Sequence, residues 1–169
     1  YKIFPTPRLS IPDSNFTIGE EIVEVSDSEI EIVLNISQIL NFKEIKYKKL
    51  LINKGSSKIN FNTTNQLISL VNKNKKKLTF RNNDFIFFQD DRIFFEINDS
   101  LIKINQSREK NFLTLNGKFL DNKIFIKFNN TLENKNNLTL KIPELDIATR
   151  VFFEKNNSNN TSGFFNIEV

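Results

Sequence analysis

The sequence predicts a mainly β protein: one long antiparallel sheet, curled into a groove or an open sandwich, with one or two short helices. Val, Ile, Thr and Phe are plentiful, whereas Ala occurs only at Ala148, and this composition favours strands over helices. Apolar and polar residues alternate along most of the chain. Turn-forming Asn, Asp and Gly separate the alternating segments at intervals of about ten residues, as in a β-meander.

Each alternating segment is expected to be a strand. In chain order these are residues 29–34, 44–53, 58–61, 77–81, 84–89, 92–98, 101–105, 111–115, 118–120, 123–128, 137–142, 149–154 and 163–169. Asn116-Gly117 is the strongest turn signal, because Asn-Gly supplies the positive φ angles of a type I′ hairpin. Weaker turn signals lie at residues 53–55, 89–91, 98–100 and 121–122.

Two stretches interrupt the alternation and are expected to be helical. Residues 37–40 could form a single turn with Ser37 as its N-cap. Residues 63–71 place Leu67, Leu70 and Val71 at helical spacing. No stretch is typical of a linker between domains, so residues 1–169 are interpreted as one β-rich segment.

The composition excludes several classes of chemistry. The chain contains no Cys and no His, which rules out disulfides, thiolate nucleophiles, imidazole bases and the usual zinc sites. Asp90-Asp91 and Glu20-Glu21 are adjacent pairs, interpreted as solvated carboxylates rather than catalytic ones. The four Gly residues form no phosphate-binding loop. An enzyme is therefore the least supported class, and no metal or cofactor is expected.

The net charge of +4 is a mild basic bias. The only dense basic run is residues 72–77, which is expected to be a solvated loop, so no nucleic-acid partner is predicted. Neither a membrane-spanning run nor a signal peptide is found. Because the chain begins at Tyr1 and lacks Met, it is expected to be a segment of a longer protein.

Several predicted strands are apolar on one face, and that face must be covered. It could be the core of a sheet folded on itself, or the lining of an open groove that takes an acyl chain. The same side chains serve either interpretation: Phe85, Phe87, Ile93, Phe95, Ile97, Ile102, Ile104, Ile124, Ile126, Phe128, Leu138, Leu140 and Ile142. Lys46, Lys48 and Lys49 could attract anionic headgroups at a rim or form a solvated strand face.

A series of hydrophobic patterns punctuated by Pro and Gly opens the chain, at residues 7–11 (PRLSI), 16–19 (FTIG), 29–37 (EIEIVLNIS), 38–40 and 45–53. The series continues near the end, at residues 138–146 (LTLKIPELD) and 162–167 (SGFFNI). In this order, the elements resemble the AsmA-like family of periplasmic proteins. The patterns that carry the resemblance contain no catalytic residue.

The resemblance implies a non-enzymatic groove that binds or conducts phospholipid or another acyl lipid. It also implies a periplasmic location, a tether to the inner membrane through other parts of the full-length protein, and a role in phospholipid transport between membranes or in outer-membrane assembly. The alternative is a structural β-module with a closed hydrophobic core that binds other proteins through strand edges.

Overall fold

The computed structural model confirms a mainly β fold. It describes residues 6–19, 22–34, 47–63, 66, 77–106, 110–131, 135–155 and 161–168. The strands are β1 (Arg8–Ile18), β2 (Val23–Leu34), β3 (Tyr47–Asn53), β4 (Ser56–Asn60), β5 (Lys77–Gln89), β6 (Arg92–Gln106), β7 (Lys110–Phe119), β8 (Asn122–Thr131), β9 (Lys135–Ile142), β10 (Ile147–Lys155) and β11 (Thr161–Glu168). Two 3₁₀ turns, η1 (Phe61–Thr63) and η2 (Pro143–Leu145), accompany them.

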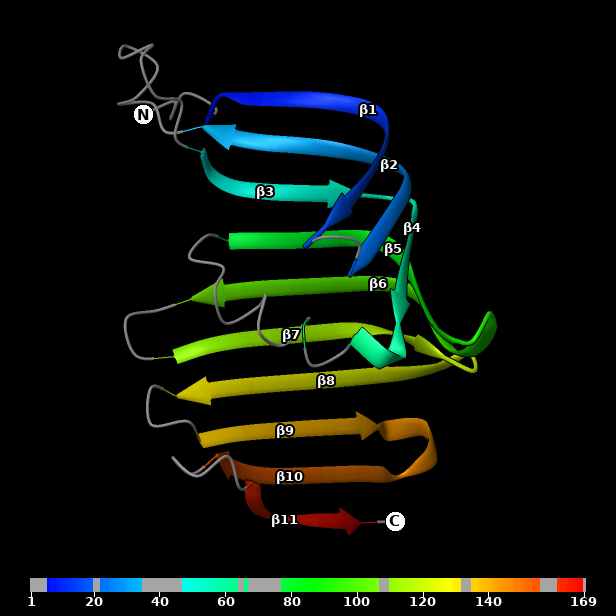
Figure 1. Ribbon diagram of the computed structural model, residues 1–169, viewed down its shortest axis with the longest axis vertical. Coiled ribbons are helices and arrows are strands. Elements are labelled where there is room, and N and C mark those ends of the chain that lie inside the picture. Colours follow the sequence, from blue (N-terminus) through cyan, green and yellow to red (C-terminus); the bar gives the residue numbers. More distant parts are fainter. Residues whose placement is uncertain are drawn as a thin grey trace.

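All of these strands belong to a single sheet (Figure 1). Neighbours in the sequence pair antiparallel, except that β3 and β4 lie end to end between β2 and β5. Both run parallel to β5, with the same register offset: Lys49 pairs with Lys77, and Ser56 pairs with Asp84. The sheet is therefore a β1–β4 unit joined to a β5–β11 meander along one parallel seam.

A row of backbone irregularities crosses the sheet from β1 to β6. Strands β1, β2, β5 and β6 each contain a residue with a left-handed backbone at the point where their pairing register shifts. The junction between β3 and β4 contains two more. These residues are Asp13, Asp27, Lys54, Gly55, Asn82 and Asp99, with φ between 48° and 86°. Bulges bend a strand and increase its twist, so bulges on neighbouring strands bend the whole sheet along one line.

The bend divides the sheet into two arms. The long arm contains β3, β7 to β11 and residues 8–11, 29–34, 77–81 and 101–106. The short arm contains β4 and residues 14–18, 23–26, 84–89 and 92–98. In Figure 1, the strands bend at the right, and the short arm lies in front of the middle of the long arm.

The extra residue at each bulge keeps the apolar side chains on the inner face of both arms. In β5, the inward residues are even-numbered before Asn82 (Leu78 and Phe80) and odd-numbered after it (Phe85 and Phe87). The same change occurs in β6 across Asp99. Since side chains alternate with period two, an uninterrupted strand would have turned one of these sets outward.

Small polar side chains satisfy backbone groups along the bend. Asn83 and Ser100 are fully buried, and the Ser100 hydroxyl donates to the Asn83 carbonyl over 2.7 Å. The Asn83 amide donates to the carbonyls of Ile52 and Arg81, both at 3.3 Å. Ser28, also buried, donates to the carbonyl of Ser14. These bonds offset the desolvation of polar groups that the bulges remove from the regular ladder.

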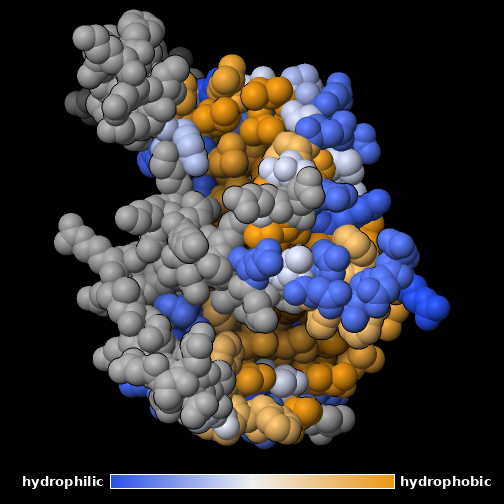
Figure 2. Space-filling view, viewed as in Figure 1, coloured by the Kyte–Doolittle hydropathy of each residue, from blue (hydrophilic) through white to orange (hydrophobic). Residues whose placement is uncertain are grey.

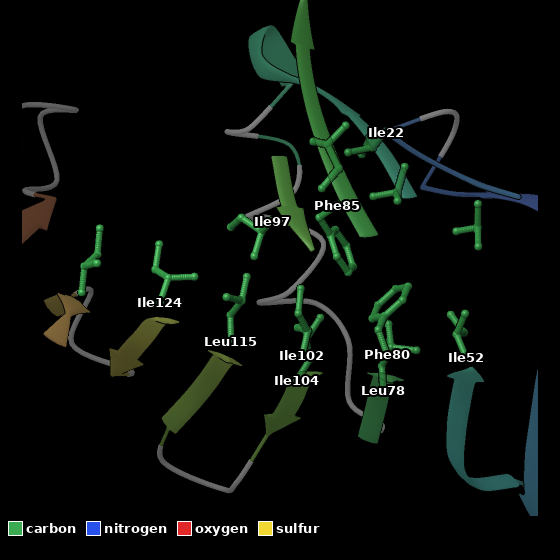
Figure 3. Close-up of a cluster of buried hydrophobic side chains, with 14 residues drawn as sticks. Ile22, Ile52, Leu78, Phe80, Phe85, Ile97, Ile102, Ile104, Leu115 and Ile124 are labelled. Atoms are coloured by element: carbon green, nitrogen blue, oxygen red, sulfur yellow. The ribbon is translucent and has the colours of Figure 1, made fainter. Parts of the chain in front are cut away.

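The hydrophobic core lies between the two arms (Figure 3). Phe85 on the short arm meets Phe80 on the long arm edge to face, with ring centroids 5.2 Å apart. Ile97 on the short arm lies opposite Ile102 and Leu115. The sheet therefore covers part of its own apolar face. Of the two predicted shapes, a groove and an open sandwich, this arrangement is closer to the open sandwich.

The predicted hairpin at Asn116-Gly117 is wrong. Both residues lie inside β7, and the turn to β8 is formed by Leu120 and Asp121, with φ of 48° and 62°. Gly117 is present for packing: a Cβ there would lie 2.6 Å from Ile97 Cγ2. The predicted turn at residues 89–91 is confirmed, since Asp90 and Asp91 join β5 to β6.

Other differences follow from the bend. The expected turns at residues 53–55 and 98–100 do not reverse the chain: the first is the short break between β3 and β4, and the second is a bulge within β6. Segments predicted as separate strands are therefore joined in β5 and β6, and those in β7 are joined because no turn forms at Asn116-Gly117. Strand β1 and the first half of β2 were not predicted. The expected helix at residues 37–40 and most of the one at 63–71 lie outside the described residues.

The left-handed backbone at Asn82 (φ 50°) predicts a difference between two substitutions. Asn82→Gly should stay within about 1 kcal/mol of the parent, because Gly adopts this conformation without steric cost. Asn82→Val should lose about 1 to 2 kcal/mol, since this conformation is tolerated by Asn but is unfavourable for a β-branched side chain. Urea unfolding measures both. Asn98→Val, on the extended part of β6, is the matched control, and an equal loss there would contradict the explanation.

Close packing at Gly117 predicts that Gly117→Ala destabilises the fold. The new methyl group would overlap Ile97 Cγ2 and lie 3.2 Å from Ser100 Cβ, so the two arms would have to separate. Overpacking of this kind costs about 1 to 3 kcal/mol. Thermal or urea unfolding should show the loss for Gly117→Ala and little change for Asn116→Ala, whose side chain is exposed. Unchanged stability of Gly117→Ala would refute the packing role.

Candidate functional site: the inner face of the sheet

Two apolar rows cross the inner face of the long arm from edge to edge. In each row, every residue is the direct pairing partner of the next. The first is Leu9, Ile32, Leu50, Leu78, Ile104, Leu113, Phe128, Leu138, Val151 and Phe165. The second is Ile11, Ile30, Ile52, Phe80, Ile102, Leu115, Ile126, Leu140, Thr149 and Ile167. Only Thr149 interrupts them.

The middle of both rows is closed by the short arm. Leu78, Ile104 and Ile102 are about 5 to 6% exposed, and Ile52 is fully buried. Side chains of the short arm, such as Phe85 and Ile97, provide the cover. At these strands the apolar face is an ordinary protein core.

The ends of both rows are open. At the β11 edge, Phe165 and Ile167 are 71% and 55% exposed, and at the β1 edge, Leu9 and Ile11 are 53% and 42% exposed. Figure 2 shows hydrophobic surface at both ends of the molecule, on either side of the polar band formed by the short arm. Exposed apolar surface that continues a buried row is typical of a binding site.

The predicted lining residues divide between the closed and open parts. Buried are Phe85, Ile97, Ile102, Ile104, Ile124, Phe128 and Ile142. Half-buried are Phe87, Phe95, Ile126, Leu138 and Leu140. One hydrophobic cluster contains all of them except Phe128 and Leu138. Ile93 is 62% exposed beside the β5–β6 turn and does not join the cluster.

Sequence reasoning missed the residues at the open ends. Leu9 and Ile11 were not assigned to a strand, and Phe165 and Ile167 were assigned to one without being placed on this face. Val151 and Phe153, both half-buried, complete the open end on β10. The alternation of residues 149–154 and 163–169 was the available signal, but it does not show which strand pairs with which.

The inner face has little capacity for polar chemistry. Among the residues that the structure describes, no three Asp or Glu side chains gather into a possible metal site. A shallow cavity of about 310 Å³ at the ends of β9 to β11 is not part of this face, because its lining includes the outward-facing Phe152 and Phe164 beside polar residues such as Lys135 and Glu154. The inner face can bind apolar groups.

The opposite, outer face of the long arm carries cations. Lys49, Lys77, Arg81 and Lys103 lie close together on β3, β5 and β6, and Lys127 lies two strands farther along. Partial burial lowers the pKa of Lys49 from its usual 10.5, and the charges of Arg81, Lys103, Lys77 and Arg8 lower it further. Of the expected rim lysines, Lys48 is exposed, on the opposite face from Lys49, and Lys46 lies outside the described residues.

Comparisons with known proteins give no family: neither a family model nor a curated protein matches the chain. Among the described residues, no helix has the length and apolarity needed to cross a membrane.

The lowered pKa of Lys49 predicts a stabilising substitution. The folded state disfavours the charged amine, so stability should rise as the pH climbs from the lowered pKa towards 10.5, the ordinary value. Lys49→Gln should therefore raise the urea midpoint at pH 7, and the gain should shrink as the pH rises from the lowered pKa to beyond 10.5, above which the parent amine is mostly neutral in both states. Lys48→Gln is the adjacent control. A gain that stays constant with pH would argue against charge as its cause.

Proposed function

We propose that this protein is a non-enzymatic lipid-binding module whose inner sheet face holds an acyl chain. The observation that carries the proposal is the continuity of the two apolar rows from the buried core to the exposed residues Phe165 and Ile167. An acyl chain lying along these rows would extend the core outward, with each buried methylene contributing about 0.8 kcal/mol.

The dimensions of the open end support this ligand class. Strands in a sheet are about 4.8 Å apart, so the half-buried and exposed row residues from β9 to β11 offer roughly 10 Å of apolar surface. Val151 and Phe165 are direct neighbours on this path, as are Leu138 and Val151. Except for Thr149, no polar side chain interrupts the path, so it favours a long aliphatic chain over a compact polar metabolite.

The resemblance to AsmA-like proteins adds a cellular setting to the proposal. In that setting, the module would be part of a longer periplasmic protein tethered to the inner membrane. It would bind or conduct phospholipid between membranes or take part in outer-membrane assembly.

A structural β-module with a closed core is the second candidate. The short arm favours it, because Phe85, Ile97 and their neighbours close the middle of the sheet without a ligand. In that case, the exposed residues of β11 would contact another protein strand rather than a lipid.

Binding of a soluble fluorescent fatty acid, used below its aggregation threshold, separates the two candidates. Phe165→Asp/Ile167→Asp places carboxylates at the ends of both apolar rows and should weaken binding by about tenfold or more, because charged groups are costly to desolvate. These residues are exposed, so the fold should survive. The matched control is Phe164→Asp/Asn166→Asp, which adds the same number of carboxylates to the same strand but on the opposite face.

Saturable binding that only the inner-face variant loses would support the lipid module and locate its site. Absence of binding by the parent protein would overturn it in favour of the closed module. Equal loss in both variants would show that the inner rows are not the site.

A further inference from the structure

The outer face of the long arm carries a second ordered row, in which Thr alternates with a cation. From β5 to β10 the direct partners are Thr79, Lys103, Thr114, Lys127, Thr139 and Arg150. The cations occupy alternate strands and are therefore about 10 Å apart. All three cationic side chains are exposed.

Further cations flank this row on both sides. Lys49 and Lys77 form a direct pair on one side of it, and Arg81 and Lys141 lie on the other. The positive charge therefore extends in two dimensions over the face. A protein that binds a linear polyanion, such as a nucleic acid strand, would instead need a single line of cations along it.

Within the described part of the chain, these cations lack neutralising partners. From β3 to β9, no described residue on this face is acidic, and the carboxylates of Glu154 on β10 and Glu168 on β11 lie on the same face at its β10–β11 edge. None of the cations named above takes part in an ion pair with another described residue. Glu31, at the β1–β2 end, pairs instead with Arg8 at 2.8 Å. Like charges collected on one face destabilise the isolated protein slightly and favour an anionic partner.

An aromatic pair adjoins the cations at the β10–β11 edge. Phe152 and Phe164 stack with ring centroids 4.8 Å apart, and Phe164 is 65% exposed. Both belong to the outer face, beside Arg150. Cations on a broad face with an exposed aromatic group at its margin are the combination that binds the interfacial region of an anionic bilayer.

We propose that the outer face of the long arm, centred on Lys103, Lys127 and Arg150, docks the protein on an anionic membrane surface. The face contacts phosphate headgroups through its cations and the interfacial region through Phe164. The opposite face, with its apolar rows, then points away from that membrane. This inference does not depend on whether the inner face binds an acyl chain.

Sedimentation with phospholipid vesicles tests the inference. The parent protein should bind vesicles containing about one third phosphatidylglycerol, should not bind phosphatidylcholine vesicles, and should dissociate as salt rises from about 0.05 M to about 0.5 M. Lys103→Gln/Lys127→Gln/Arg150→Gln should weaken binding by about 100-fold, since each cation at such a surface contributes roughly fivefold. The control, Lys48→Gln/Lys58→Gln/Arg92→Gln, removes the same charge from exposed positions off this face and should change binding little.

The orientation has its own readout. The chain has no Trp, so Phe164→Trp introduces a single fluorescent reporter at the edge of the face. Its emission should shift to shorter wavelength with the anionic vesicles and stay unchanged with phosphatidylcholine.

Three outcomes would overturn the proposal. Equal weakening by the two triple variants would mean that net charge, not this face, drives binding. An unshifted emission of the Phe164→Trp variant in its vesicle-bound state would exclude contact at the aromatic edge. Tighter binding to duplex nucleic acid than to anionic vesicles, lost in the same triple variant, would assign the face to a polyanion instead.

Discussion

The architecture depends on one line of left-handed residues that crosses the sheet. Asp13, Asp27, Asn82 and Asp99, with the Lys54-Gly55 break, each add a backbone irregularity at nearly the same height on neighbouring strands. Asp, Asn and Gly tolerate this conformation better than other residues, and buried Ser and Asn side chains satisfy the backbone groups beside them. Without this alignment the sheet would not bend, and its apolar face would have no cover.

The same backbone geometry separates two chemically distinct faces. Because each strand keeps its alternation within an arm and the bulges restore it between arms, apolar side chains collect on the inside and cations on the outside. Lys103 and Ile104 are adjacent in the chain and belong to opposite faces. Both proposed functions of the molecule therefore depend on strand register, since a slip by one residue would exchange the faces.

Local alternation made most strands and their apolar sides predictable, and it placed Phe85, Ile102 and Ile124 correctly among side chains that lie together. The bend was not predictable in the same way. An Asp-Ser or Asn-Asn pair between two alternating segments has the composition of a turn, and only the pairing partners show that the chain continues through it. The change from even to odd apolar positions across Asn82 is visible in the sequence, but it is equally consistent with two separate strands.

Features that depend on several strands were missed for a related reason. Lys103, Lys127 and Arg150 are far apart in the sequence, so no basic cluster appears until the strands are placed in register. The exposure of Phe165 follows from its position on the edge strand, which alternation alone does not reveal. A glycine is required at Gly117, but the reason is the close approach of the Ile97 side chain and not a turn.

The parallel seam between β3–β4 and β5 has a consequence for the order in which the chain can fold. Every other ladder except β2–β4 joins consecutive strands, so it can form early with a modest entropic cost of loop closure. The seam must bring together two preformed antiparallel units, and it must do so with Gly55 beside Asn82 so that the bend is continuous. Formation of this seam is the slow, error-sensitive step that the topology implies, because a misaligned seam would leave two flat sheets with their apolar faces in water.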